Sequence, residues 1–515
     1  MGAVLSTHPH HHPIYLASET MGNMTIRNLT ITPLELKKFK RLTKAPAPAQ
    51  LSGTSGLAKI TARITGRKTE PPAVTPTATA ADPQAGHGPS PSEEQDISGV
   101  FVQPFSESVT SITPPDTSRE EQLRLTFEEA GTGHRYVVEI PGPSPSSVVM
   151  RHADATGDST ADPSGKEFTV VYLPRAAFLS IFSSANLSSW MAALPPSLPL
   201  SSLSIPGTHN SPTHYVALPS VRCQAVSVRE QLDNGVRFLD IRVSCPDEAS
   251  GDDDLALVHS AFPISLSGSK WFHDLLTEVY AFLDARPSET VLVSVKREGT
   301  GKGSDQLLSR HLARRYMTPD KWYTEPRIPS LAEVRGRVVL VRRFHLDDSL
   351  RGEHDGAGLG IDGSVWPDNC ADGTCGSGMI RIQDFYEVGQ TEDIDKKIDL
   401  ARAELERAAQ QACVLPGMPQ AQDQGAGPLP FFINFLSASS FFNASCWPDR
   451  IAAKINPFII EYLCTGHGAP GKGPGQLTVG DAGTGIVVMD WVGNNGDWDL
   501  VRCIVGWNTR LQLKQ

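Results

Sequence analysis

The sequence predicts an α/β protein whose carboxyl-terminal part is a distorted, TIM-type (β/α)8 barrel, preceded by a small all-β domain. From residue 201 onward, eight short apolar runs follow one another, with helix-period segments between several of them. Before residue 175, shorter runs alternate apolar and polar residues, which is typical of half-buried strands. Strands that alternate with helices favour a parallel sheet, and eight of them indicate a closed barrel.

The first part of the chain is expected to hold a flexible amino terminus over 1–19 and a sandwich-like β domain over 20–175. Residues 44–98 interrupt that domain with Pro, Ala, Ser, Thr and Gly and almost no aromatic side chains. Such a segment cannot bury enough apolar surface to offset the entropy of ordering, so we expect a disordered insert. Residues 176–200 are expected to link the β domain to a barrel over 201–515.

Each barrel strand is expected at one apolar run. In chain order the runs are LSIPGTH (203–209), VRFLDIRV (236–243), LALVHS (255–260), TVLVSVKRE (290–298), RVVLVRRF (337–344), MIRIQDFY (379–386), FFINFLSAS (431–439) and GIVVMDWV (485–492). The helical period of 271–286 ends before Pro287, as a proline requires. Residues 345–378 are rich in Gly and Asp and show no helical period, so we expect a gap in the ring of helices there.

Nearly every one of these runs ends in a polar or charged residue. In a barrel of this kind, chemistry sits at the carboxyl ends of the strands. A single histidine or charge at such a place is usually structural, but convergence of many on one rim indicates a functional site. The candidates are His209, Asn210, Asp240, Arg242, His259, Lys296, Arg343, Asp384, Tyr386 and Asp490.

Two histidines with an arginine between them suit attack on a phosphodiester without a metal. Imidazole titrates near neutral pH, so His209 and His259 can divide the roles of base and acid. Arg242 offers fixed positive charge to oxygens that become more negative in the transition state. A carboxylate such as Asp490 is expected to hold one imidazole in its correct tautomer.

At these residues the sequence resembles the phosphatidylinositol-specific phospholipase C family, in its bacterial-type, X-domain-like form. The resemblance covers roughly 190–510 and rests on an ordered set of motifs. They are IPGTHNS, GVRFLDIRV, LVHS, SVKRE, RGRVVLVRRF, VWPDN, RIQDFY, INFLSAS, KINPFIIEYL and VVMDWV.

The resemblance implies a phosphoric diester hydrolase or lyase that cleaves phosphatidylinositol to diacylglycerol and inositol 1,2-cyclic phosphate. His209 would be the general base, His259 the general acid, and Asp490 the group that orients His209. Arg242, with Asp240 beside it, would stabilise the phosphoryl oxygens. The inositol ring would be bound by Lys296, Arg343, Asp384 and Tyr386.

One residue departs from the bacterial pattern, because Asn210 stands where those members commonly have an aspartate. We expect its amide to hold His259 by a hydrogen bond without stabilising the charged imidazolium as a carboxylate would. Calcium-dependent relatives also place an asparagine here, but they need acidic residues where this chain has Arg242 and Lys296. A hard cation wants several oxygen ligands, so we expect no metal requirement and no cofactor.

Two other functions remain open from the sequence. A membrane-associated lipid-binding or scaffold protein with a weakened site is compatible with Asn210 and with the long insert. A barrel glycerophosphodiesterase is the other alternative, although that class normally needs a carboxylate-rich metal site. Turnover of phosphatidylinositol separates these alternatives from the phospholipase.

Composition bounds the partners and the location. A net charge of −11 argues against nucleic acid as the main partner, and no run approaches the length of a membrane span. Gly2 with Ser6 fits the N-myristoylation pattern, so we expect a cytoplasmic protein at a peripheral membrane surface. Phe262, Trp271 and Phe272 are candidates for lipid contact, with core packing as the alternative. The eight cysteines are expected to be reduced, and the sequence gives no oligomeric state.

Overall fold

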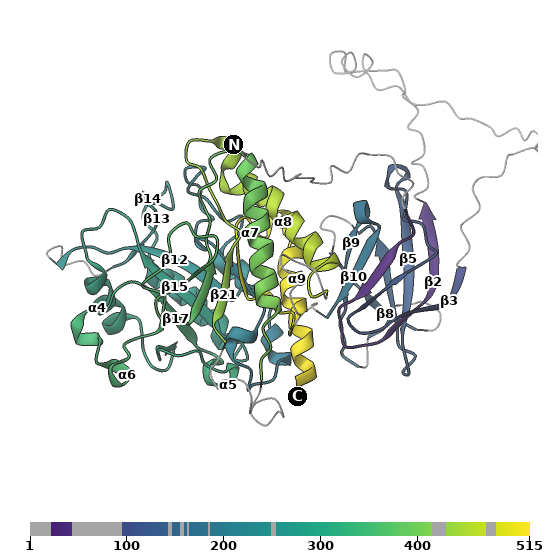
Figure 1. The fold of residues 1–515 in the computed structure, drawn as a ribbon, viewed down its shortest axis with the longest axis horizontal. Coiled ribbons are helices and arrows are strands. Elements are labelled where there is room, and N and C mark those ends of the chain that lie inside the picture. Colours follow the sequence, from purple (N-terminus) through teal and green to yellow (C-terminus); the bar gives the residue numbers. More distant parts are fainter. Residues whose placement is uncertain are drawn as a thin grey trace, which may run out of the picture.

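In the computed structural model, two units can be described, a smaller β unit and a larger α/β unit (Figure 1). The described residues are 22–43, 95–142, 147–154, 159–161, 164–183, 186–248, 254–414, 429–469 and 480–514. The flexible amino terminus expected over 1–19, Gly2 included, lies outside them, as do residues 44–94 of the expected insert.

The β unit contains two five-stranded sheets that share one hydrophobic core. The first sheet has the order β4 (Ser106–Val109), β1 (Thr25–Asn28), β10 (Phe178–Phe182), β9 (Thr169–Leu173), β7 (Ser147–Val149). The second has the order β3 (Gln95–Val102), β2 (Leu34–Thr43), β5 (Glu121–Glu129), β6 (Arg135–Ile140), β8 (Arg151–Ala153). Alternate residues of both sheets, such as Ile26 and Phe127, are fully buried in that core.

Two expected boundaries of this unit are corrected. Strand β3 begins at Gln95, inside the segment expected to be a disordered insert, because it pairs with β2 along one edge. Strand β10 was expected to belong to a linker, yet it pairs with β9 and runs parallel to β1. Its apolar side chains, Leu179 and Ile181, complete the core of the first sheet.

The larger unit is built on a curled, mostly parallel sheet in which spatial order follows chain order. The parallel strands, taken around the sheet, are β11 (Ile205–Thr208), β12 (Phe238–Ser244), β15 (Val291–Arg297), β17 (Val338–Arg343), β18 (Ile361–Asp362), β20 (Ile380–Gln383), β21 (Phe431–Phe435) and β22 (Ile486–Met489). The first and last, β11 and β22, are hydrogen-bonded neighbours. Among the described residues no ladder joins β18 to β20, so the sheet is curled but not closed by hydrogen bonds.

One predicted strand is wrong. The run 255–260 forms β13 (Ala256–His259), which pairs antiparallel with β12 and with β14 (Phe262–Pro263) and therefore does not belong to the parallel sheet. Its place in the count is taken by β18, only two residues long and too short to give an apolar run. Two other short strands, β16 (Trp322–Tyr323) and β19 (Gly373–Thr374), extend the edges of the sheet.

Helices connect most of the parallel strands. They are α2 (Val228–Asp233), α3 (Phe272–Ala285), α4 (Asp305–Arg315), α5 (Leu331–Val334), α6 (Glu353–Gly356), α7 (Glu392–Ala409), α8 (Pro448–Thr465) and α9 (Asp499–Gly506). Their starts have local causes: the Ser304 hydroxyl caps α4, and Pro448 occupies the first turn of α8. Within 345–378 the only α-helix is the four-residue α6, where the sequence indicated a gap.

The two units pack against each other along α8 and α9, which lie beside β9 and β10 in Figure 1. Leu29, Val171 and Phe182 of the β unit join the hydrophobic core of the larger unit. The buried Arg27 guanidinium donates to the carbonyl oxygens of Cys464 and His467, at 3.0 and 2.8 Å. The β unit is therefore attached through its own core and not only by its chain connection.

Candidate active site

Three candidate side chains sit where the chain leaves a strand, and each is followed by a residue in the left-handed conformation. His209 follows β11, His259 ends β13 and Asp490 follows β22. The next residues have positive φ angles: Asn210 (42°), Ser260 (52°) and Trp491 (58°). Non-glycine residues rarely adopt this conformation, and for a tryptophan it is a clear outlier. The chain therefore turns sharply directly after each of these side chains.

His209 and His259 face each other at one end of the curled sheet. Their ring centroids are 5.7 Å apart and the ring planes are perpendicular. His209 Nδ1 lies 2.9 Å from Asp490 Oδ1, and the Asn210 amide nitrogen lies 3.1 Å from His209 Nε2. With a carboxylate at one nitrogen and an amide donor at the other, the partners assign the proton to Nδ1 and leave Nε2 as an acceptor.

His259 has a different environment. Its Nδ1 lies 2.8 Å from the carbonyl oxygen of Val221, which can only accept, so Nδ1 carries a proton. Burial, together with the smaller effects of His209 and Arg242, lowers the pKa of His259 to about 4. With these neighbours His259 is therefore neutral at pH 7.

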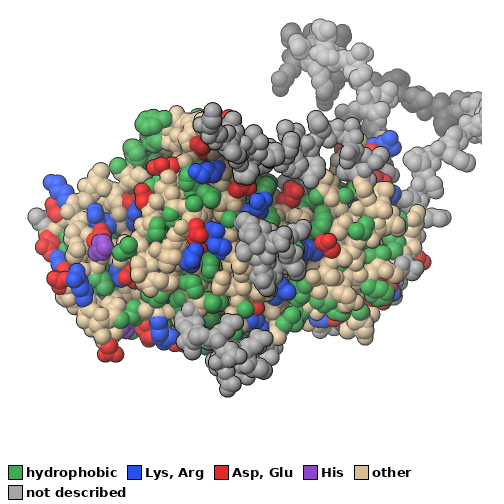
Figure 2. Space-filling model, in the orientation of Figure 1, with side chains coloured by type: hydrophobic (Ala, Val, Ile, Leu, Met, Phe, Trp, Pro, Cys, Tyr) green, Lys and Arg blue, Asp and Glu red, His purple; other side chains and the backbone are tan. Residues whose placement is uncertain are grey.

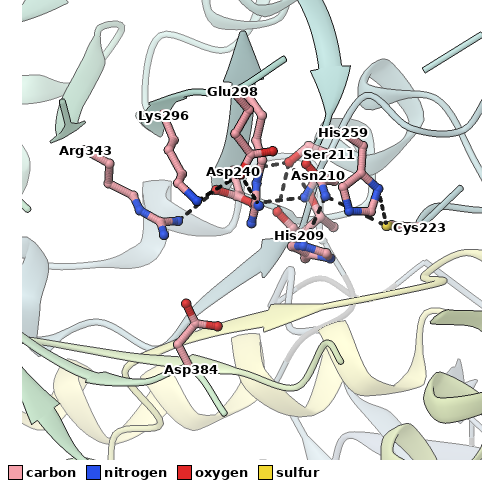
Figure 3. A network of polar contacts seen from close by, with 12 residues as sticks. His209, Asn210, Ser211, Cys223, Asp240, His259, Lys296, Glu298, Arg343 and Asp384 are labelled. Atoms are coloured by element: carbon pink, nitrogen blue, oxygen red, sulfur yellow. Dashed lines mark hydrogen bonds and ion pairs between the residues drawn. The ribbon is translucent and has the colours of Figure 1, made fainter. Parts of the chain in front are cut away.

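Arg242 forms the centre of an ion-pair network with Asp240 and Glu298. Figure 3 shows these two carboxylates side by side. Its guanidinium donates to Asp240 Oδ2 at 3.1 Å and to Glu298 Oε1 at 2.7 Å. Burial alone would raise the pKa of Asp240, but the charges of Arg242 and Arg343 outweigh it and hold that pKa below its usual range. The same balance, with Arg242 and Lys296 as the cations, lowers the pKa of Glu298 to about 2. Both carboxylates are thus ionised and hold Arg242 in place.

A cavity of about 540 Å³ opens beside the two imidazoles. Arg343 packs over the Trp366 ring, 3.8 Å from its centroid, and Trp366 Nε1 donates to Asp384 Oδ2 at 3.0 Å. In Figure 3, Asp384 lies across the site from the Asp240 cluster. The lining residues include His209, Arg242, His259, Lys296, Glu298, Arg343, Trp366, Asp384, Tyr386, Ser439 and Phe441.

The structure brings most of the sequence candidates to this cavity. His209, Arg242, His259, Lys296, Arg343, Asp384 and Tyr386 line it, while Asp240 and Asp490 are buried behind Arg242 and His209. Arg342, the neighbour of Arg343, instead pairs with Asp362 and with the carbonyl of Leu359. Phe272, a candidate for lipid contact, is fully buried in the core because it lies on the inner face of α3.

The expected role of Asn210 is wrong in one respect. Among the described contacts its amide meets His209 and Cys223 Sγ, the latter at 4.0 Å, and none joins it to His259. The left-handed backbone at Asn210 directs its side chain back toward the preceding residue, and the Val221 carbonyl takes the place beside His259.

Sequence reasoning missed three residues of the site. Glu298 is the last residue of the run 290–298 and directly follows β15, so the position near the end of the run that singled out Lys296 could also have marked Glu298. Trp366 and Cys223 lie on loops without any periodic pattern. Trp366 stands in the motif VWPDN, which contributed to the resemblance but did not single it out as a site residue, and Cys223 gave no signal. Cys223 Sγ lies 3.7 Å from His259 Nδ1.

The cavity thus combines two imidazoles with arginine and lysine side chains at one end of a curled, mostly parallel sheet of an α/β protein. Such a set of groups can bind an anion and exchange protons with it. Residues 197–344 match the family model described as "Phosphatidylinositol-specific phospholipase C, X domain". The resemblance seen in the sequence is thereby confirmed over these residues, which are similar to the X domain of the phosphatidylinositol-specific phospholipase C family.

Individual relatives share about a quarter to a third of the residues over the aligned part of the chain. A 1-phosphatidylinositol phosphodiesterase of Listeria monocytogenes is 32% identical over 182 residues, covering 33% of this chain and 53% of that protein. The chain thus spans about half the length of that relative. The Staphylococcus aureus protein of the same name is 24% identical over 330 residues, covering 60% of this chain and 90% of that protein. The human PI-PLC X domain-containing protein 1 is 30% identical over 200 residues, with 32% and 59% coverage.

Solved structures of the bacterial phospholipases are also similar. A mutant of the S. aureus enzyme superposes with a TM-score of 0.47 and 22% identity, covering 63% of this chain and 98% of that chain. The Listeria monocytogenes enzyme gives a TM-score of 0.45 and 21% identity, with 63% and 99% coverage. No helix within the described residues is both long enough and apolar enough to span a membrane.

Proposed function

We propose that the protein is a metal-independent phosphatidylinositol-specific phospholipase C, which cleaves phosphatidylinositol to diacylglycerol and inositol 1,2-cyclic phosphate. One observation carries this proposal: two imidazoles with different partners face each other beside Arg242 at an open cavity. His209 Nε2 can accept a proton, and His259 can donate one after a bound phosphodiester has raised its pKa. A hydroxyl attacking a phosphodiester from within the same molecule needs that pair of roles.

The reaction transfers one proton at each histidine. His209 Nε2 accepts the proton of the inositol 2-hydroxyl, whose oxygen then bonds to phosphorus. The bond from phosphorus to the glycerol oxygen breaks, and His259 gives a proton to that oxygen as diacylglycerol leaves. Asp490 stabilises the imidazolium that forms on His209 and keeps Nε2 directed at the substrate. Asn210, now at Nε2, gives way to the substrate hydroxyl.

The phosphate itself completes the charge state of the site. His259 is neutral beside its protein neighbours alone, but an anionic phosphodiester next to it favours the imidazolium and raises its pKa. Asp240 and Glu298 fix the guanidinium of Arg242, so it does not have to reorient when the substrate binds. Its charge is therefore preorganised for the phosphoryl oxygens, which is the arrangement that lowers a barrier most effectively.

The rest of the cavity is proposed to bind the inositol ring. Lys296, Arg343 and Asp384 offer charged donors and acceptors to ring hydroxyls, and Tyr386 offers an aromatic face. Trp366 fixes both Arg343 and Asp384, so it positions two of these groups. A polyol with several equatorial hydroxyls suits such a wall of alternating charges.

Apolar side chains beside the cavity are proposed to meet the lipid surface. Phe442 is 95% exposed and Phe441, which lines the cavity, is 49% exposed. Phe262 stacks on Phe441 with centroids 5.6 Å apart. Figure 2 shows hydrophobic side chains gathered at the upper edge of the larger unit, the edge where β13 and β14 lie in Figure 1. Peripheral binding through these rings, a cytoplasmic location and acylation of Gly2 all belong to this proposal.

The test is cleavage of phosphatidylinositol in vesicles, with phosphorus NMR of the water-soluble product. A cyclic phosphate should appear first, in the presence of chelator. The variants His209→Ala and His259→Ala should each lower the rate by at least about 100-fold, since one acid or base contributes 10²- to 10⁴-fold. His273→Ala, an exposed histidine on α3, is the matched control. No turnover, with vesicle binding retained, would instead identify a lipid-binding protein.

A further inference from the structure

We propose that His209, Cys223 and His259 form a binding site for a thiophilic divalent cation such as Zn²⁺, which inhibits the protein by occupying both imidazoles. This inference rests on the proposed function for its inhibitory part and on geometry alone for the binding part. One ligand atom from each of the three side chains lies within 4.8 Å of the other two. Figure 3 shows Cys223 and His259 in contact and His209 close by.

The spacing fits a tetrahedral ion after small side-chain rotations. Zinc binds sulfur at about 2.3 Å and imidazole nitrogen at about 2.0 Å, so neighbouring ligand atoms stand about 3.5 Å apart. Cys223 Sγ and His259 Nδ1 are already 3.7 Å apart. A set of one thiolate and two imidazoles favours zinc or cadmium, whereas calcium and magnesium prefer oxygen ligands.

Asn210 supplies a second observation that points to a ligand. The residue is 1% exposed, and its Oδ1 has no hydrogen-bond partner. Its amide nitrogen lies between the candidate ligands, 3.1 Å from His209 Nε2 and 4.0 Å from Cys223 Sγ. Rotation of the amide by half a turn replaces this nitrogen with the unpartnered oxygen. That oxygen can then complete the coordination as a fourth ligand.

The neighbouring charges do not prevent a cation from entering. The cations of the cluster are balanced by carboxylates: Arg242, Lys296 and Arg343 face Asp240, Glu298, Asp384 and Asp490. Asp490 lies behind His209 and stabilises the ligating tautomer, as carboxylates commonly do for metal-bound histidines. Binding converts the Cys223 thiol to a thiolate, and its proton is released to solvent. His259 has to change tautomer as well: Nδ1 gives up the proton that it donates to the Val221 carbonyl, and Nε2 takes one up, so that Nδ1 can bind the ion.

Binding is tested directly with Cd²⁺ and Zn²⁺ on the intact protein. One Cd²⁺ per chain should produce a thiolate-to-cadmium absorption band, and calorimetry should show one Zn²⁺ site. Cys223→Ala should abolish the band and weaken Zn²⁺ binding by more than about 10-fold, the least that even a group outside the first coordination shell costs. Cys446→Ala, another fully buried free thiol, is the matched control and should bind as the unmodified protein does. Equal metal binding by Cys223→Ala overturns the proposal.

Inhibition is measured as the ratio of cleavage rates with and without Zn²⁺ within each variant. The unmodified protein and Cys446→Ala should lose most of their activity at a Zn²⁺ concentration that saturates the unmodified protein. At the same concentration, the factor by which Zn²⁺ slows Cys223→Ala should be at least about 10-fold smaller. Excess Ca²⁺ or Mg²⁺ should not inhibit. A cadmium band without any phosphatidylinositol cleavage would refute the proposed function and leave the site intact. Cleavage that Zn²⁺ inhibits equally in Cys223→Ala would refute the site alone.

Discussion

Asp490 is the side chain that makes the two imidazoles of the cavity unequal. It is buried, and one of its oxygens is bound to His209 while the other, Oδ2, has no hydrogen-bond partner. Burial raises the pKa of Asp490, and the interaction with His209 offsets part of that rise. The hydrogen bond from His209 Nδ1 is therefore the main contact that stabilises the ionised form of this buried carboxylate.

Asp490→Asn should leave the fold intact and lower kcat by about 10²- to 10⁴-fold, because an amide can hold His209 in the wrong tautomer. The measurement is the initial rate on phosphatidylinositol vesicles, with circular dichroism to show an unchanged fold. Asp320→Asn, an exposed carboxylate away from the cavity, is the control and should retain full activity. Retained activity in Asp490→Asn would show that His209 needs no carboxylate partner.

The sequence predicts residues of the site well where they stand next to a strand. His209, Asp490 and Lys296 each adjoin an apolar run, so the pattern of the core also locates them. Residues that the loops supply have no such signal. Val221 and Cys223 reach His259 only because the chain after β11 folds back, and no periodicity records that fold. The partner of Asn210 depends on one left-handed backbone angle, which the residue type permits but does not require.

At the scale of elements, α7 carries an unusual residue into the core. Lys397 is fully buried on its inner face, and its ammonium donates to Gln383 Oε1 at 3.1 Å. Burial lowers the pKa of Lys397 to about 7, despite the favourable charges of Asp384 and Asp490. Below that pH the folded protein holds a buried cation. Between about 7 and 10.5 the unfolded chain keeps a proton that the folded protein has lost, so stability rises with pH.

Lys397→Met should therefore stabilise the protein, by about 1 to 4 kcal/mol at about pH 6 and by less at about pH 9. The measurement is urea unfolding at both values of pH. Lys396→Met, the exposed neighbour on the same helix, should change stability little at either pH. A loss of stability at pH 6 would show that Asp384 and Asp490 compensate the buried charge fully.

Sequence prediction of the strands fails where the chain departs from a regular barrel, either because an apolar run lies outside the parallel sheet or because a sheet strand is too short to form a run. The run 255–260 has the apolar content of a barrel strand. It instead pairs antiparallel with β12 and β14, so its apolar side chains pack in the excursion that carries His259 and not in the parallel sheet. Strand β18 has only two residues. The residue before it, Gly360, has to be a glycine because a side chain at that position would collide with Leu340. Local sequence cannot distinguish such a short strand from a bend.

At the scale of the whole molecule, Arg27 joins the two units. Its guanidinium donates to two carbonyl oxygens at the end of α8, and burial lowers its pKa. The Ser180 hydroxyl donates to one of the same carbonyls at 3.1 Å. The units should accordingly unfold in a single transition.

Arg27→Met should weaken the interface by about 2 to 3 kcal/mol, because charged hydrogen bonds are lost and two buried carbonyls lose a donor. Scanning calorimetry should then resolve two transitions in place of one. Arg124→Met removes a half-exposed pair with Glu139 inside the β unit and should leave a single transition. A single transition in Arg27→Met would show that the apolar contacts of Phe182 and Leu29 suffice.

The missing ladder between β18 and β20 has a consequence for where the folded protein opens locally. Every other junction of the parallel strands has to break interstrand hydrogen bonds to part, but this one does not. Backbone amides of residues 361–362 in β18, which in the described part of the chain pairs only with β17, should thus exchange with deuterium sooner than those of β12 and β15, which are paired on both sides. The loop that carries Trp366 connects β18 to β19 beside this junction, so the wall of the cavity that Trp366 forms is expected to yield most easily to a larger ligand.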